Sequence, residues 1–226
     1  MNRLLPAPLL VAALALPFAA CKSTPPLPDG GGPGLVAFDP AAPASTQVYQ
    51  RPEWRVGDTF AMLRGGKQRL EFTVMAADAD TYTLQDQHGN RMVRGRDLSN
   101  VGEWPAEGDE PTHVLTPPDV RFHWPLWVGK RWRCKYSDRT AGGRALPIES
   151  AYEVEDLDTI ETPGGTFPAL RIVRTSRLEL EQGNYADRVM LIWYAPDLGL
   201  EVRQVLGDTA IELVEWTRAA APAGGD

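Results

Sequence analysis

The stretch Phe122–Tyr136, FHWPLWVGKRWRCKY, decides the fold, because it changes from irregular backbone to a strict alternation of side chains. Pro125 and Gly129 interrupt the backbone in its first half. From residue 130 onward, apolar and basic residues alternate: Trp132, Cys134 and Tyr136 fall on one side, and Arg131, Arg133 and Lys135 on the other. A period of two is typical of an antiparallel strand with one buried face. The stretch therefore predicts a strand that begins near residue 130.

Shorter alternating segments, separated by turn residues, lie on both sides of this stretch. Leu70–Met75 and Phe167–Leu180 alternate, and turns are indicated at residues 88–90 (HGN) and 162–165 (TPGG). Glycine and asparagine accept the positive φ angles that tight turns need. No apolar stretch has the length and period of an amphipathic helix. The chain is therefore predicted to be all-β, an antiparallel meander that forms a curved sheet or half-barrel.

Two short segments resemble each other and raise the alternative of two similar halves. Trp54–Phe60 (WRVGDTF) and Leu126–Trp132 (LWVGKRW) share a Val-Gly pair and end on an aromatic residue. The halves would span residues 47–115 and 120–218. A turn glycine followed by a core aromatic would produce the same likeness without duplication, so both interpretations stay open on the sequence.

The composition excludes several classes of protein. The 21 glycines and 20 prolines favour turns over long helices, and 43% hydrophobic residues are enough for a core. The formal net charge of −7 argues against nucleic acid as a partner. Because the two cysteines lie far apart and processing is expected to consume the first, we predict neither a disulfide framework nor a thiolate metal site.

The first twenty residues have the organisation of an export signal. Met1–Ala20 carries Arg3 near its start, an apolar run over residues 4–16, and small residues before Cys21. The sequence FAAC at 18–21 resembles the lipobox of bacterial lipoproteins, although that family usually has leucine where this chain has phenylalanine. The resemblance implies that Cys21 becomes the acylated N-terminus. Since Lys22 and not aspartate follows it, the resemblance also implies an outer-membrane lipoprotein that faces the periplasm. The alternative is a secreted protein with a free cysteine.

The two ends of the mature chain are predicted to be disordered. Residues 21–46 are rich in proline and glycine and poor in large apolar side chains, and residues 219–226 have a similar composition. Such segments cannot bury enough surface to offset the entropy that ordering costs. The first would act as a tether that lifts the domain clear of the bilayer. The β domain is predicted to span residues 47–218.

Three segments together resemble a family of uncharacterised, β-rich secreted and lipoprotein domains of Gram-negative bacteria. They are Phe122–Trp132 with its W-P-L-W-V-G-K-x-W run, Thr162–Ile172 (TPGGTFPALRI) and Trp193–Arg203 (WYAPDLGLEVR). The chain departs from the family pattern at Gly165, where alanine is usual, and at Asp197, where glycine is usual. The resemblance implies the same β fold. The family has no established activity, so it assigns no catalytic residue to this chain.

Two sets of side chains in the opening stretch are candidates for ligand contacts. One is a set of tryptophans that could line a concave face and stack on a sugar or enclose an acyl chain. The other is a basic row that could contact anionic headgroups or glycan carboxylates. Each also has a structural interpretation, as ordinary core or as a polar outer face paired with the acidic segment 149–161. The residues are Trp124, Trp127 and Trp132, and Arg131, Arg133 and Lys135.

No pattern in the sequence predicts a catalytic residue, a metal site or a cofactor. His88, His113 and His123 lack the spacing of metal ligands, and hydrolase and phosphate-loop motifs are absent. Cys134 shares a face with apolar residues and is predicted to be a buried, unreactive thiol; the alternative is a nucleophile assisted by His123. The acidic residues of 149–161 are expected on a solvated face.

These observations predict a membrane-anchored periplasmic lipoprotein with a non-catalytic role in binding or in envelope assembly. Its candidate partners are an envelope lipid, a glycan or another protein, in addition to the membrane that its anchor enters. Two alternatives stay open. One is a glycan hydrolase that uses a pair of carboxylates from 149–161, and the other is a purely structural lipoprotein.

Overall fold

The computed structural model describes residues 27–30 and 34–220, and the predicted export signal and Cys21 lie outside them. All of its regular structure is β-sheet apart from a short 3-10 turn, η1 (Glu181–Gly183), which confirms the predicted fold class. The strands are β1 (Leu35–Phe38), β2 (Thr59–Arg64), β3 (Gln68–Ala77), β4 (Thr81–Asp86), β5 (Arg91–Gly95), β6 (Asn100–Trp104), β7 (His113–Asp119), β8 (Arg131–Thr140), β9 (Leu146–Thr162), β10 (Gly165–Glu179), β11 (Tyr185–Ala195), β12 (Leu200–Leu206) and β13 (Thr209–Thr217). Within the described part of the chain, no helix has the length and apolar character needed to cross a membrane.

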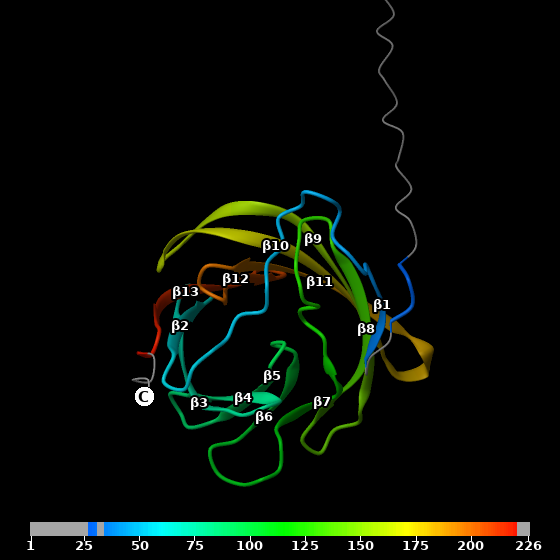
Figure 1. Ribbon diagram of the computed structural model, residues 1–226. Coiled ribbons are helices and arrows are strands. Elements are labelled where there is room, and N and C mark those ends of the chain that lie inside the picture. The colour runs from blue at the N-terminus through cyan, green and yellow to red at the C-terminus, as the bar shows by residue number, and fades with distance from the viewer. Residues whose placement is uncertain (1–26, 31–33, 221–226) are drawn as a thin grey trace, which may run out of the picture.

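A single antiparallel sheet contains all of these strands and closes on itself (Figure 1). Its order is β1-β8-β7-β6-β5-β4-β3-β2-β13-β12-β11-β10-β9, and a further pairing of β8 with β9 joins the two sides. Strands β2–β13 therefore form a barrel, and β1 is an extra strand on β8. The curvature that the sequence predicts as a curved sheet or half-barrel continues to full closure. Closure pairs the strand edges that an open sheet would leave exposed.

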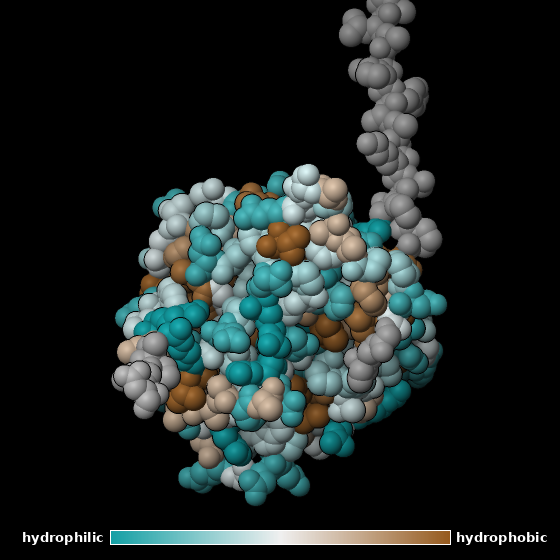
Figure 2. Space-filling view, in the orientation of Figure 1, coloured by the Kyte–Doolittle hydropathy of each residue, from teal (hydrophilic) through white to brown (hydrophobic). Residues whose placement is uncertain are grey.

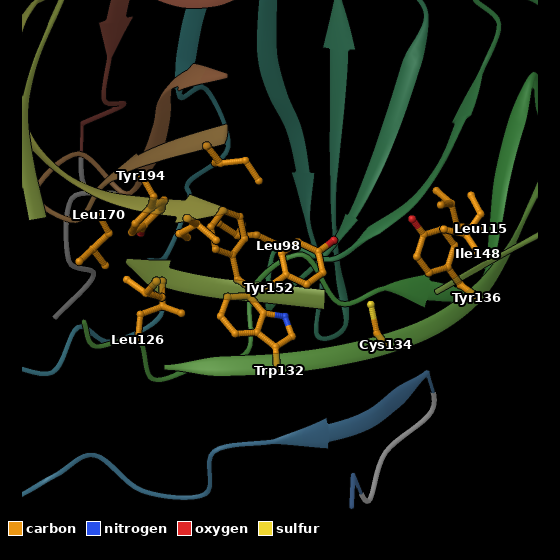
Figure 3. Packing of buried hydrophobic residues seen from close by; sticks show 14 of the residues in the cluster. Leu98, Leu115, Leu126, Trp132, Cys134, Tyr136, Ile148, Tyr152, Leu170 and Tyr194 are labelled. Carbon is orange, nitrogen blue, oxygen red and sulfur yellow. The ribbon is translucent and has the colours of Figure 1, made fainter. Parts of the chain in front are cut away.

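Strand β8 lies at the seam where the barrel closes. Its inward side chains are Trp132, Cys134 and Tyr136, as the alternation predicts, and all three are buried (Figure 3). One edge of β8 pairs with β9, and the other edge pairs first with β1 and then with β7. Across the seam, the Trp132 ring stacks on that of Tyr152, with centroids 4.9 Å apart and planes 4° from parallel. The opening stretch therefore supplies the contact that closes the barrel.

The two similar Val-Gly segments of the sequence form the same turn. Their glycines, Gly57 and Gly129, have positive φ angles of 88° and 94°. The amide of Gly57 donates a hydrogen bond to the carbonyl of Val74, and the amide of Gly129 donates to the carbonyl of Val154. In return, the amides of Val74 and Val154 donate hydrogen bonds to the carbonyls of Asp58 and Lys130, the residues that follow the two glycines. The likeness therefore reflects one repeated way of starting a strand, at β2 and at β8, within a single barrel.

The tip of the β9–β10 hairpin folds over the outside of β11–β13 (Figure 1). At this tip, the amide of Gly164 donates a hydrogen bond to the carbonyl of Leu213 in β13. Trp193 of β11 faces the hairpin, and its Nε1 donates to Asp158 Oδ2 over 2.9 Å. Arg203 lies over the same ring, 5.4 Å from its centroid. A second apolar cluster around Trp193 holds the hairpin against the barrel.

The predicted tether is shorter than expected, because part of it joins the sheet. Residues Leu35–Phe38 form β1 on β8, Ala37 is fully buried, and Asp29 makes an isolated bridge to Ala37. The apolar sequence LVAF gives this segment a side to bury, and the edge of β8 leaves room for it beside β7. The predicted tail is likewise held at its start, where the amide of Ala219 donates to Asp58 Oδ1 over 2.8 Å.

One end of the barrel is covered by two segments that contain no strand. Residues 39–58 and 120–130 cross this end in Figure 1, and Tyr49 and Leu126 form a backbone bridge between them. Phe122 and Leu126 are fully buried, and the ring of Trp124 lies 5.4 Å from that of Tyr194. Figure 2 shows the same end covered by side chains. We call residues 120–130 the plug. The irregular half of the opening stretch therefore closes the barrel at one end.

Candidate binding site inside the barrel

A cavity of about 320 Å³ lies inside the barrel, on the side away from the plug. Asp119 and Arg174 lie at its floor, and the exposed residues Glu103 and Arg188 lie at its mouth, so it reaches solvent there. This volume falls within the range of known small-molecule sites. Because side chains of eight strands, β5–β12, line it, closure of the barrel creates the cavity. Its lining includes Met92, Arg94, Asn100, His113, Leu115, Tyr136, Asp138, Ile148, Ser176, Leu178, Met190 and Leu206.

A buried carboxylate, Asp119 at the end of β7, organises the floor of this cavity. It accepts hydrogen bonds from the Tyr152 hydroxyl (2.7 Å) and the Cys134 thiol (3.4 Å), and lies 3.3 Å from Arg174 Nη2. Arg174 also donates to the Tyr136 hydroxyl. Burial, reinforced by the charge of Asp119, raises the pKa of Tyr152 well above its usual value and raises the pKa of Tyr136 to about 12. Both phenols are therefore protonated donors at neutral pH.

A bidentate ion pair joins the plug to the opposite wall. Arg121 Nε and Nη2 donate to the two carboxylate oxygens of Glu201 in β12, both over 2.6 Å. The two side chains are only 5% and 13% exposed. Burial alone lowers the pKa of Arg121 and raises that of Glu201. Each partner's charge outweighs this, so the pKa of Arg121 lies above its usual value and the pKa of Glu201 lies below its own. Both groups are therefore charged at neutral pH.

A third guanidinium, that of Arg94 in β5, lies inside the barrel without a carboxylate partner. It donates to Asn100 Oδ1, and its Nε donates to Met92 Sδ over 3.4 Å. No carboxylate of the described residues lies within 4.0 Å of it. Burial lowers the pKa of Arg94 below its usual value. Its charge is balanced only at longer range, chiefly by Glu201 and less by Glu103 and Asp119, and Asn100 links it to Asp119 through a 3.4 Å hydrogen bond.

A second interior cavity of about 170 Å³ adjoins the first. Met92 and Arg94 line both cavities, and Glu201 lines the second on the far side of Arg94. The rest of its wall is mostly apolar, although it also includes Arg64 and Gln204, and most of it comes from β2–β4, β12 and β13. These residues include Trp54, Phe60, Met62, Leu70, Phe72, Leu84, Leu98, Leu200 and Ile211. The barrel interior therefore has a charged compartment and an apolar one, which meet at Arg94.

The structure places Trp127 and Trp132 in the core and not at a ligand-facing surface, whereas Trp124 lines a separate pocket with Gln50 and Arg51. Trp132 has no exposed surface and Trp127 is 3% exposed, so protein atoms cover both rings. Trp124 packs within the plug, and its Nε1 donates to the Asp97 carbonyl over 2.7 Å. None of the three lines either interior cavity. The apolar surfaces of Trp127, in the plug, and Trp132, in β8, are used to close the barrel.

The basic row of Arg131, Arg133 and Lys135 lies on the outer face of β8. Arg131 Nη2 is 3.1 Å from Asp39 Oδ1, and Arg133 and Lys135 lie 3.5 and 3.3 Å from Glu149 of β9. The row therefore meets acidic residues across the sheet, as its structural interpretation expects. It lines neither interior cavity. Because Arg133 and Lys135 are largely exposed, their pairs with Glu149 add little to stability.

The acidic residues of the 149–161 segment also lie outside the barrel. Glu155, Asp156 and Asp158 surround Arg171 of β10, at 3.2, 4.0 and 3.3 Å. None of the segment's carboxylates lines either interior cavity. These carboxylates lie outside because side chains alternate along β9, and the apolar and hydroxyl side chains between the acidic residues point into the barrel.

The three histidines lie in three separate places. His88 is on an exposed hairpin turn, His113 lies 3.1 Å from Asp138 at the cavity mouth, and the His123 ring packs on Phe38 beside the plug. Within residues 27–30 and 34–220, no three His, Cys, Asp or Glu side chains form a group that could hold a metal ion.

Cys134 is buried next to Asp119 in the floor of the charged cavity. Burial, together with the carboxylate of Asp119, raises the pKa of this thiol well above its usual value. Its hydrogen bond goes to Asp119 and not to His123. At neutral pH, Cys134 is therefore a thiol and not a thiolate, which is the nucleophilic form.

The environment of His123 predicts a loss of stability in acid. Burial and the nearby Lys130 lower the pKa of His123 from 6.5 to about 4. Between these values the unfolded chain binds a proton that the folded chain does not, so stability falls as the pH falls. The contribution is at most about 1.4 kcal/mol per pH unit. In urea unfolding between pH 7 and pH 4, His123→Gln should lose less stability than the wild type. The exposed His88→Gln variant should follow the wild type, and an equal slope for all three would contradict the prediction.

Sequence reasoning missed the five interior charges. They are Arg94, Asp119, Arg121, Arg174 and Glu201. Only Arg174 has a clear local signal, since it falls on the same face of its strand as Ile172 and Leu178. A charge on an apolar face indicates a buried partner. Its partner, Asp119, lies on another strand and has no such signal.

No protein family and no curated protein matches this chain by sequence, but several solved structures resemble it distantly. The hypothetical lipoprotein YmcC of Escherichia coli (K12) is 12% identical, with a TM-score of 0.49 over 73% of this chain and 85% of that one. A candidate lipoprotein of Parabacteroides distasonis is 10% identical, with a TM-score of 0.43 over 75% and 99%. An exported protein of Bacteroides fragilis with a YmcC-like fold is 11% identical, with a TM-score of 0.41 over 76% and 100%. These likenesses are too distant to assign a family.

Proposed function

We propose that this protein is a lipid-anchored binding protein of the bacterial envelope, whose barrel takes a small ligand through one end. The observation that carries the proposal is the interior cavity of about 320 Å³, which opens to solvent opposite the plug. A barrel of this kind could equally have been filled by side chains. Here, ordered polar groups such as Arg174 and Tyr136 line a space of ligand size.

The proposed anchor is Cys21, at the end of a sequence that resembles a lipobox. Since Asp29 already pairs with Ala37, about eight residues connect the anchor to the barrel, and an extended chain of that length spans at most about 28 Å. The barrel would therefore stay close to the membrane surface. An outer-membrane lipoprotein that faces the periplasm fits both the export signal and this short connection.

The proposed role is binding without catalysis. Its support is that the buried acids of the interior are engaged in structural pairs, Asp119 with Arg174 and Glu201 with Arg121. A glycan hydrolase needs two carboxylates that face each other across the substrate. The segment that the sequence offers for that role, 149–161, lies on the outer surface and bonds to Arg171 and to the basic row.

Native mass spectrometry tests the proposed function. The chain from Lys22 onward, which keeps every described residue and lacks the anchor, would be exported to the periplasm and purified without detergent. The expected result is a discrete added mass of a few hundred daltons that disappears under denaturing conditions. A bare polypeptide mass under several growth conditions would contradict ligand binding and favour a purely structural role. As a separate check on the anchor, the wild type should show covalent acyl mass that Cys21→Ala lacks.

A further inference from the structure

The charges inside the barrel do not balance. Three guanidinium groups, those of Arg94, Arg121 and Arg174, face two buried carboxylates, Asp119 and Glu201. Each carboxylate already has its arginine, at 2.6 Å for Glu201 and 3.3 Å for Asp119. Arg94 is left over, with only the neutral acceptors Asn100 and Met92. A charge removed from water is costly unless an opposite charge compensates it.

Arg94 also occupies a special position between the two cavities. Its side chain lines the charged cavity on one side and the apolar cavity on the other. A guanidinium offers five N–H donors, and only two hydrogen bonds from Arg94 to the protein are present. The remaining donors are available to a group that enters the charged cavity. An apolar chain attached to that group would find Phe60, Leu70 and Phe72 within the second cavity.

The mouth of the charged cavity shows no comparable excess of positive charge. Arg188 is exposed there and has no ion pair among the described residues, but Glu103 lies on the same rim. Asp138 at the mouth faces His113 over 3.1 Å. Selection for charge would therefore occur at depth, at Arg94. A neutral sugar would leave that charge uncompensated, and two of the tryptophan rings first expected to stack on a sugar, Trp127 and Trp132, are covered by protein.

We propose that the ligand is an amphiphile with one oxyanion headgroup, a carboxylate or a phosphate, which binds Arg94, and a short apolar chain, which enters the second cavity. This inference rests on the proposed function and specifies its ligand class. The small volume of the apolar cavity, about 170 Å³, favours a short or partly inserted chain. Headgroup recognition by Arg94, which is half-buried inside the barrel, would be charge-assisted and bidentate, which is the strong form of such contacts.

Isothermal titration calorimetry of the detergent-free chain from Lys22 tests the proposal with four probes. These are octanoate, octyl phosphate, octanol and inorganic phosphate. We expect octanoate or octyl phosphate to bind at least about tenfold more tightly than octanol, because an arginine inside the barrel distinguishes a charged acceptor from a neutral one. Free phosphate should bind at least about tenfold more weakly than octyl phosphate, because it leaves the apolar cavity empty.

Arg94→Met should remove the preference for the acid over the alcohol, bringing the ratio of their dissociation constants close to one. Arg91→Met is the matched control, because Arg91 lies on the same strand, lines neither cavity and donates instead to the Gly108 carbonyl. It should keep the wild-type preference. Thermal unfolding would show whether each variant is folded. The comparison of octanoate with octanol in the wild type needs no variant.

Each result of these titrations supports or overturns one part of the proposed ligand class. Equal binding of octanol and octanoate, or an acid preference that survives in folded Arg94→Met, would overturn the headgroup assignment and leave the proposed function in place. Free phosphate that binds as tightly as octyl phosphate would overturn the apolar chain. If none of the probes binds, the inferred ligand class is wrong, and the native mass measurement decides separately whether the barrel carries another ligand.

Discussion

Arg121→Met is expected to lower the free energy of unfolding by about 3–5 kcal/mol, because it leaves the Glu201 carboxylate buried without its partner. The pair spans the interior from the plug to β12, with both hydrogen bonds at 2.6 Å. Methionine preserves the length of the side chain, so the loss would come mainly from the uncompensated charge. Urea unfolding at pH 7, followed by tryptophan fluorescence, measures the difference.

Two control variants separate the buried charge from the loss of an arginine. Arg177 pairs with Asp187 at 3.0 Å, but both side chains are more than half exposed. Arg177→Met should therefore leave the free energy of unfolding nearly unchanged. The double variant Arg121→Met with Glu201→Leu should recover most of the stability, since an apolar pair can replace a buried ion pair at little cost. If Arg121→Met and Arg177→Met lost similar amounts of stability, the buried pair would contribute no more than an exposed pair does, and the prediction would be wrong.

Trp132→Ala is expected to cost about 3–5 kcal/mol, the usual range for removing a fully buried tryptophan. The ring has no exposed surface, stacks on Tyr152 across the β8–β9 seam, and donates from Nε1 to the Val120 carbonyl over 2.8 Å. Figure 3 shows it among the residues of the main core. The substitution would leave a cavity at the point where the barrel closes and where the plug begins. Chemical unfolding measures the loss.

Trp132→Phe is the conservative control for this prediction. A phenylalanine ring can still stack on Tyr152, and the variant loses part of the buried area together with the hydrogen bond to Val120. We expect a cost of about 1–2 kcal/mol, well below that of alanine. If the two variants were equally destabilised, the hydrogen bond and not the packed ring would hold the seam.

Local patterns predicted the strands well. The alternation after residue 130 placed Trp132 and Tyr136 inward and Lys135 outward, which is how β8 presents them. The glycine-containing turns were also predictable, since Gly57 and Gly129 adopt the positive φ angles that their Val-Gly segments suggested. These features depend on neighbouring residues alone, which is why composition and period are enough to find them.

Features that depend on distant partners were predicted less well. The segment Leu35–Phe38 was assigned to a tether because its surroundings are rich in proline and glycine, but β8 offers it an edge. Trp127 in the plug and Trp132 in β8 were expected to face a ligand, yet both rings are buried in the core. In both cases, a contact with another part of the chain outweighed the local composition.

The alternation and the turn residues establish an antiparallel β protein without reference to any coordinates, and the N-terminal residues predict its export. The closure of the barrel, the plug and the interior charges follow only from the tertiary structure. Arg121 and Glu201 are 80 positions apart in the chain, and Tyr152 and Asp119 are 33 apart. A charged side chain on a strand gains a buried partner only when the fold of the whole sheet places the opposite charge next to it. For the same reason, the excess charge at Arg94, and with it the inferred ligand, could not be seen in the sequence.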